Sequence, residues 1–246
     1  MKRVVTWFSA LMILIGASSS AHALLTNGTF DATVLVEVSP GFSLPHPANW
    51  VNDGSKTNSG PFIDGLSSEP WAGPAPTPDT NPGDFGVFFK PFAGTLSTGD
   101  LLTVHLRQDV AGTAGLRYVL TGWAGAEANF SGFIAGTATK AELAVEFLDA
   151  GNSVIGGDVR DLIAEGLGST VGAPFGYKQF TAAALAPAGT VSVRARASLI
   201  DGYGNPAGGG QAFVVDDFVL TAVPEPASMV LVGAGLLGLI ALRRRG

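Results

Sequence analysis

Apolar and polar residues alternate in several parts of the chain, and this pattern limits the possible folds more than any other feature. The clearest examples are the segments 102–107, 142–147 and 191–199, in which every second residue is apolar. Successive side chains of a strand point to opposite faces, so this period of two predicts strands with one buried face. Further strands are expected at 34–38, 85–89, 117–123, 177–182 and 211–220.

About eight such strands, separated by Gly, Pro, Asn and Asp, predict an all-β fold, an antiparallel β-sandwich spanning residues 24–222. One segment, 158–168, is expected to form a short helix instead. Residues 39–83 are rich in proline, glycine, serine and asparagine, and this composition predicts a single long loop. Loops of such length within a compact domain are usually functional or disordered.

The N-terminus has the three parts of a secretory signal peptide. Lys2 and Arg3 are followed by an apolar run from Val4 to Gly16 and by a small-residue site ending at Ala23. Residues 1–23 are therefore predicted to be a signal peptide, with Leu24 as the first mature residue. An uncleaved anchor helix is the alternative, but the apolar run is short for a membrane span.

The C-terminus combines a short motif, an apolar segment and a basic cluster. Pro224, Glu225 and Pro226 precede sixteen uncharged residues, 227–242, and three arginines at 243–245. Sixteen helical residues span about 24 Å, somewhat less than the roughly 30 Å hydrocarbon core. We expect a short transmembrane helix in the inner membrane, with the arginines on the cytoplasmic side and the domain outside.

This order of elements resembles the PEP-CTERM sorting signal of Gram-negative bacteria, and residues 223–246 carry the resemblance. The resemblance implies transient handling by an exosortase, a membrane enzyme thought to cleave near Pro-Glu-Pro in species that make exopolysaccharide and biofilm matrix. The protein is then expected to be anchored in transit and to reach the cell surface or extracellular matrix. A plain membrane anchor without processing is the alternative.

Charge and cysteine content exclude several classes of function. Residues 24–226 contain nine basic and twenty acidic residues, a net charge of −11. Binding to nucleic acid needs a basic surface, so nucleic acid is not an expected partner. The chain has no cysteine, which excludes thiol catalysis, iron–sulfur clusters and thiolate zinc sites.

A second resemblance covers most of residues 24–222. The stretches TNGTFDA, AELAVEFLDAGNSVI, APAGTVSVRARA and AFVVDDFVLTA are similar to galactose-binding-like and carbohydrate-binding-module-like jelly rolls. The resemblance implies a structural calcium ion held by Asp31 and Asp216, and alternation places Asp216 on the same inward face as Phe218 and Leu220. In the alternative, Asp31 caps a turn and Asp216 accepts backbone hydrogen bonds.

A candidate ligand site comes from outward positions of three predicted strands. If these positions share one face, arginine and aromatic side chains there fit an acidic sugar, and Arg107, Arg117 and Trp123 are the selected ligand-binding residues. In the alternative, Arg194 and Arg196 simply pair with Glu142 and Glu146 across a solvated sheet. The full set of outward residues is His105, Arg107, Arg117, Trp123, Arg194 and Arg196.

No catalytic motif is present: the sequence has neither H-E-x-x-H nor G-x-S-x-G. The leading hypothesis is therefore an exported, non-enzymatic protein of the envelope or matrix that binds exopolysaccharide. One alternative is a polysaccharide-active enzyme, a glycosidase or lyase, because a catalytic carboxylate pair need not be adjacent in sequence. Another is a purely structural biofilm-matrix protein cross-linked by divalent ions.

Overall fold

The computed structural model describes residues 23–57, 64–70, 84–169 and 175–223. The predicted signal peptide up to residue 22, the Pro224-Glu225-Pro226 motif, the helix 227–242 and the arginines 243–245 lie outside these residues. None of the helices in the described part of the chain has the length and apolar character that crossing a bilayer requires.

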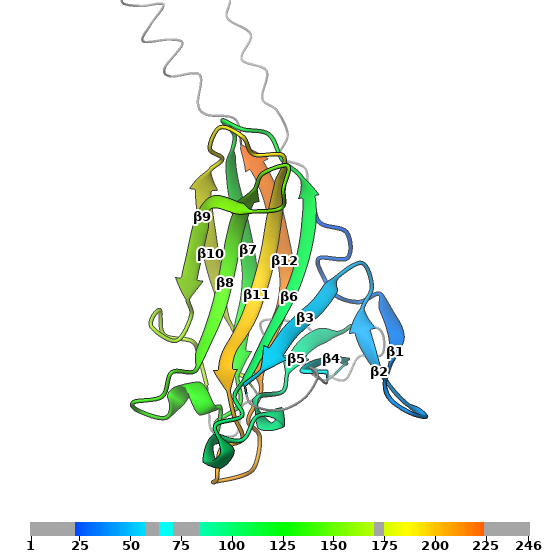
Figure 1. The fold of residues 1–246 in the computed structure, drawn as a ribbon, viewed down its shortest axis with the longest axis vertical. Helices are drawn as coiled ribbons and strands as arrows, with labels where there is room; N and C mark the ends of the chain where they lie inside the picture. Colours follow the sequence, from blue (N-terminus) through cyan, green and yellow to red (C-terminus); the bar gives the residue numbers. More distant parts are fainter. Residues whose placement is uncertain (1–22, 58–63, 71–83, 170–174, 224–246) are drawn as a thin grey trace, which may run out of the picture.

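The described residues form two five-stranded antiparallel sheets and a separate two-stranded hairpin (Figure 1). The first sheet has the order β10 (Lys178–Leu185), β7 (Arg117–Ala126), β12 (Phe213–Val223), β5 (Gly86–Phe89), β4 (Leu66–Glu69). The second has the order β3 (Val51–Lys56), β6 (Leu102–Ala111), β11 (Ser192–Gly202), β8 (Lys140–Leu148), β9 (Val154–Asp161). The hairpin pairs β1 (Thr33–Ser39) with β2 (Phe42–Pro47).

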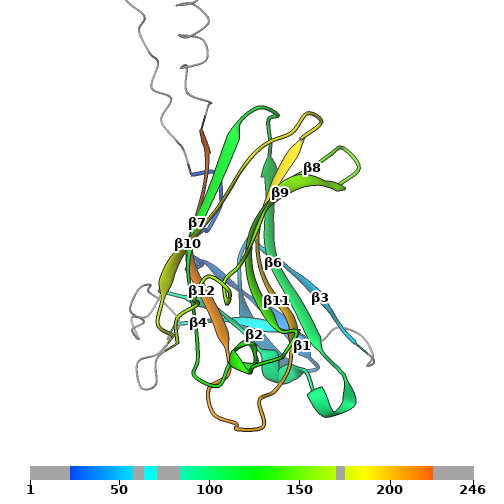
Figure 2. The ribbon, with the colours of Figure 1, turned by 90° about the vertical axis from the view of Figure 1, so that its left-hand side faces the viewer.

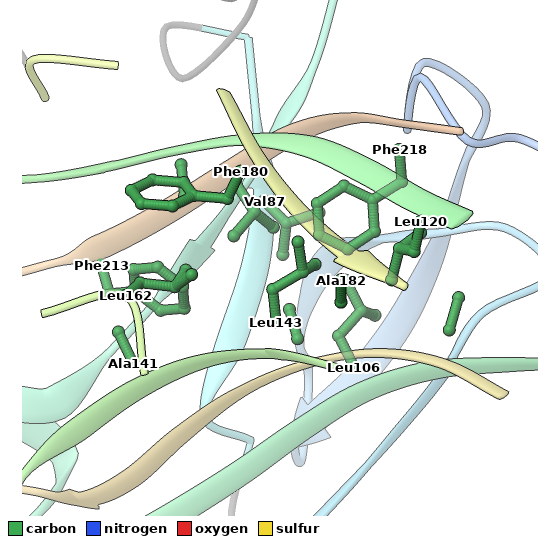
Figure 3. Close-up of a cluster of buried hydrophobic side chains, with 14 of the residues drawn as sticks. Val87, Leu106, Leu120, Ala141, Leu143, Leu162, Phe180, Ala182, Phe213 and Phe218 are labelled. Carbon is green, nitrogen blue, oxygen red and sulfur yellow. The ribbon is translucent and has the colours of Figure 1, made fainter. Parts of the chain in front are cut away.

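The two sheets stack face to face, as the edge-on view in Figure 2 shows, and the core fills the space between them. Leu106, Leu143 and Leu120 are buried there, together with the aromatic rings of Phe180 and Phe213 (Figure 3). The alternating residues of β6, β8 and β11 supply one side of this core, which confirms the predicted all-β sandwich. Within the described connections lie three short 3₁₀ helices, at Pro91–Ala93, Leu96–Thr98 and Ser131–Phe133.

The long loop expected at 39–83 is wrong for much of its length, because β2, β3 and β4 lie within it. β2 contains two prolines and β3 reads VNDGSK, so their compositions resemble those of loops. β3 and β4 are edge strands, where polar residues and short length are normal.

The short helix expected at 158–168 is also wrong, because β9 runs through Asp161 and is followed by turns. Val154, Ile155 and Val159 favour a strand, and two glycines lie between them. After the strand, the Asp161 carboxylate accepts the N–H of Ile163 at 3.1 Å. Gly166 then takes a φ of +81°, which ends the turn before a helix can form.

Candidate binding groove on the outer face of the second sheet

The outward side chains of the second sheet surround an open groove of about 470 Å³. The second sheet lies at the front in Figure 1, with its outer face toward the viewer. Along β6, β8 and β11, apolar residues that point into the core alternate with charged residues. The charged side chains therefore lie on the outer face of the sheet, where they form the groove. The residues that line it are Asp53, His105, Arg107, Glu142, Glu146, Val154, Arg194, Arg196 and Ile200.

Arg196 on β11 lies at the centre of the groove and joins β11 to β8. Its Nη2 and Nε donate to Glu146 Oε1 at 2.8 and 3.0 Å, and its Nη1 donates to Glu142 Oε2 at 3.1 Å. Nη1 also donates to the hydroxyl of Ser198. The side chain of Arg196 is only 11% exposed, so these contacts hold the guanidinium in one orientation.

The other two arginines of the groove share the carboxylate of Asp109. Arg194 makes a bidentate contact with Asp109, at 2.7 and 2.8 Å. Arg107 donates to Asp53 at 2.8 Å and to Asp109 at 3.3 Å. Hydrogen bonding to Asp109 raises the pKa of Arg194 despite its partial burial. All three guanidiniums are therefore paired with carboxylates of the protein itself.

His105 is the titratable side chain of the groove whose ordinary pKa is closest to neutrality. Its Nδ1 lies 2.7 Å from the Ser198 hydroxyl oxygen. Burial and then the positive charge of Arg196 lower the pKa of His105, while Asp53, Glu146 and Glu142 oppose this change. Its ordinary pKa is 6.5, so the imidazole is neutral at pH 7 and presents one donor and one acceptor nitrogen.

The sequence-predicted ligand residues are divided between the two sheets. Arg107 lies in the groove, but Arg117 and Trp123 lie on β7 of the first sheet. Trp123 packs against a second apolar cluster that includes Tyr177 and Val214. The structure therefore does not bring Arg107, Arg117 and Trp123 together. Alternation indicates the face of a strand on which a side chain lies, but not the sheet to which the strand belongs.

Pairing between arginines and glutamates, the alternative interpretation, is seen for Arg196 with Glu142 and Glu146. Arg194 makes its close contact with Asp109 instead, at 2.7 Å, and lies farther from Glu146, at 3.9 Å. The sequence reasoning missed Asp53, which falls in the expected loop. The segment around it, VNDGSK, has no alternation of apolar and polar residues, so no local pattern marks it as a strand.

The predicted calcium residues do not meet in the way that alternation suggested. A β-bulge in β12 places both Asp217 and Phe218 opposite Gly122, because the register shifts between Asp216 and Val219. Phe218 and Leu220 therefore face the main core, whereas Asp216 lies across from Trp123 on the outer side. The expectation that Asp216 shares a face with Phe218 is wrong for this reason.

Asp31 and Asp216 both accept backbone hydrogen bonds. Asp31 Oδ1 accepts the N–H of Phe85 at 3.1 Å, and Asp216 Oδ1 accepts the N–H of Asp217 at 2.8 Å. In the part of the chain that the structure describes, no three acidic or histidine side chains converge to hold a metal ion. These residues do not make a three-ligand site, and calcium at Asp31 and Asp216 stays a prediction.

Comparison with known proteins adds one specific match. Residues 222–245 match the family model described as the PEP-CTERM protein-sorting motif. The chain carries a PEP-CTERM sorting motif. This match covers the tail that resembled such a signal and implies export with a C-terminal membrane anchor in transit. No curated protein sequence matches the chain.

Several solved structures are distantly similar to the described domain. TmCBM61, solved with β-1,4-galactotriose, is 16% identical with a TM-score of 0.42, covering 81% of this chain and 97% of its own. The CBM22-1 xylan-binding domain of Xyn10C from Paenibacillus barcinonensis is 10% identical with a TM-score of 0.41, covering 85% and 99%. The enzymatically active domain of tailspike protein 4 from bacteriophage CBA120 is 11% identical, TM-score 0.46, over 82% of this chain. The chain spans only 21% of that tailspike.

Proposed function

We propose that this chain is an exported, exosortase-sorted and non-enzymatic protein of the cell envelope or extracellular matrix, which binds exopolysaccharide in the groove of the second sheet. The sorting motif at 222–245 supports the route of export. The groove, with its ordered network of guanidinium and carboxylate groups, is the observation that carries the proposed binding. We further infer a jelly roll, because β12 lies between β5 and β7 while β11 lies between β6 and β8.

The chemistry of the groove fits hydroxyl groups. Each sugar hydroxyl both donates and accepts a hydrogen bond, so it fits between a carboxylate and a guanidinium that already lie side by side. An acidic sugar would instead have to displace Asp109 or Glu146 from an arginine. Because Arg194 and Arg196 are held by the protein itself, little side-chain entropy is lost when a ligand binds. A neutral, hydroxyl-rich polysaccharide is therefore the proposed ligand.

Binding to the exopolysaccharide of the producing species tests this proposal. Arg107 lines the groove and its side chain is 25% exposed, so Arg107→Gln removes a charged donor that the ligand can reach. We expect binding to weaken about tenfold, which corresponds to roughly 1.4 kcal/mol. Arg160 on β9 is the matched control, since it pairs with Glu165 and does not line the groove. Equal loss in Arg107→Gln and Arg160→Gln, or no binding by the parent, would contradict the proposal.

Export is tested separately. A reporter protein that carries residues 1–23 at its start and 223–246 at its end should be found outside the inner membrane after cell fractionation. The same reporter without residues 1–23 is the control, and it should stay in the cytoplasm. Cytoplasmic retention of the complete fusion would contradict the sorting proposal but leave the binding proposal standing.

A polysaccharide-active enzyme is the second candidate, because Glu142, Glu146 and Asp53 bring three carboxylates into one groove. A glycosidase needs one carboxyl group as an acid and another as base or nucleophile. Glu142 and Glu146 both bind Arg196 here, an arrangement that holds the arginine rather than flanks a sugar bond. Release of new sugar ends from the polysaccharide, abolished by Glu142→Gln, would favour the enzyme over the non-enzymatic proposal.

A further inference from the structure

The hairpin β1–β2 stands beside the sandwich, with β1 outermost (Figure 1). It exposes apolar side chains to solvent. Leu35 is 77% exposed and Val34 49%, and Val36 and Phe42 are exposed as well. Among the described strands, β1 pairs only with β2, so its second edge has unpaired backbone donors and acceptors. Such an edge is a template for another strand.

Other sheet edges in the described residues carry features that discourage pairing. β4 has only four residues, and β3 includes Asp53 and Lys56. β9 contains two glycines and three charged residues, and on β10 the side chain of Asp158 occupies the N–H of Ala183 at 2.9 Å. These are the usual means by which proteins prevent strands from adding to an edge.

Two prolines protect the outer edge of β2, and their positions show which backbone groups of β1 are not paired with β2. Pro45 pairs with Leu35 and Pro47 with Thr33. Proline has no N–H, so it fits positions whose backbone groups point away from the neighbouring strand. Thr33, Leu35 and Glu37 share this parity and therefore direct their backbone groups to the outer edge of β1.

β1 has few of these protections, because its register with β2 shifts only near its end, between Glu37 and Ser39. Its sequence, TVLVEVS, has no proline, glycine or lysine, and Glu37 is its one charged residue. The Glu37 side chain folds back along the hairpin, where its Oε1 accepts the N–H of Gly41 at 2.8 Å. The edge is therefore open, apolar and seven residues long.

We infer that the outer edge of β1 pairs with β1 of a second copy of this chain, antiparallel about a two-fold axis at Val36. In this register Val36 faces Val36 of the second copy, Val34 faces Val38, and Leu35 faces Glu37. The three valines of each copy form one continuous apolar row. Glu37 never faces Glu37, so two acidic proteins meet here without a direct clash of charge. Thr33, Leu35 and Glu37 supply the hydrogen bonds.

One strand pair buries less than the roughly 1,200 Å² of a stable protein interface, so the contact is weak in dilute solution. It gains strength where copies are concentrated, as they are on a surface or in a matrix. The contact between the two β1 strands would then link bound copies in pairs. Detection therefore requires a covalent trap rather than a size measurement alone.

A single engineered cysteine provides that trap, because the chain has none of its own. At the two-fold axis the Val36 Cα atoms of the two copies would lie about 4.5 Å apart, within the range of a disulfide. We expect the full-length Val36→Cys protein to form a disulfide-linked dimer under mild oxidation, seen by non-reducing electrophoresis. Leu35→Cys and Val154→Cys, which are both more exposed than Val36, are the controls and should stay monomeric.

Charge at position 35 gives an independent test in the Val36→Cys background. Leu35→Lys places a lysine opposite Glu37 of the second copy and should keep or increase the dimer, whereas Leu35→Glu should reduce it several-fold. Both changes remove the same apolar side chain, which is 77% exposed, so the fold should survive either one. Equal cross-linking by all three cysteines, no cross-linking by Val36→Cys, or equal effects of lysine and glutamate would each overturn the inference.

Discussion

Asp217 occupies the bulge of β12 with a φ of +52°, a conformation that asparagine adopts as readily as aspartate. Burial first, and then the negative charges of Asp84 and Asp31, raise the pKa of the Asp217 carboxyl. The folded state thus binds a proton more tightly than the unfolded state does. Stability is therefore lost as pH rises from the ordinary value of 3.8 through the raised pKa.

We expect Asp217→Asn to raise the thermal midpoint at pH 7 by about 1–3 °C, because it removes the ionised carboxylate but keeps the backbone conformation. At about pH 3, where Asp217 is protonated in both states, the difference should vanish. Thermal melts of both proteins at the two pH values check this. A lower midpoint at pH 7 would show that the charge of Asp217 is stabilising, as a bound cation would make it.

Chelation tests the calcium prediction at Asp31 and Asp216 directly. If these residues hold calcium, EDTA lowers the thermal midpoint of the parent, and excess calcium restores it by mass action. An unchanged midpoint would contradict calcium binding at these two carboxylates. Asp31→Asn keeps an oxygen for the N–H of Phe85 and serves as the matched variant, which should not respond to EDTA in either case.

Position 122 requires glycine because the ring of Phe218 packs directly over it. A Cβ at this position would lie 2.4 Å from Cδ1 of Phe218, which is 3% exposed and packed in the main core. We expect Gly122→Ala to destabilise the fold by about 1–3 kcal/mol, measured by denaturant unfolding. Gly204→Ala is the control, since its nearest neighbour would be 3.5 Å away. Adding Phe218→Leu to Gly122→Ala should cost less than the sum of the two single changes.

At the scale of the strand, β6 and β11 meet in the groove through His105 and Ser198. The lowered pKa of His105 means that the unfolded chain binds its proton first as pH falls below about 6.5. Stability should therefore decline as pH falls through the ordinary value of 6.5 toward the lowered pKa, and His105→Asn should reduce this decline. Thermal melts across this range check the expectation. An equal decline in both proteins would assign the pH dependence to other groups.

The strands that could be predicted from the sequence are those in which apolar residues on one face alternate with polar residues on the other. In β6 and β11 the inward residues are apolar apart from Gln108, and the residues between them are mostly polar, because each strand has one face in the core and one in water. β3 and β4 have polar residues on short edge strands, so no such contrast exists. The bulge at Asp217 likewise inverts the pattern of β12, and no glycine or proline marks its position.

At the scale of the whole molecule, the groove depends on which strands become neighbours. Asp53, His105 and Arg196 are separated by about fifty and ninety residues, and only the order β3, β6, β11 brings them together. Local pattern correctly placed His105, Arg107, Arg194 and Arg196 on outward positions of their strands. It could not assign Arg117 and Trp123 to a different sheet, because strand order is a property of the complete fold.

At the scale of the whole molecule, the sorting motif directly follows the folded domain. It covers residues 222–245, and the last strand, β12, ends at Val223. We expect Glu225→Ala to block processing, so that full-length protein accumulates in the membrane, anchored by residues 227–242. The thermal midpoint of the folded domain should stay the same, because surface changes away from packed sites usually alter stability by less than about 0.5 kcal/mol. Membrane fractionation and mass spectrometry of the C-terminus measure processing, with Ser228→Ala as the control outside Pro-Glu-Pro. Release of the Glu225→Ala protein like the parent would mean that the tail acts only as an anchor.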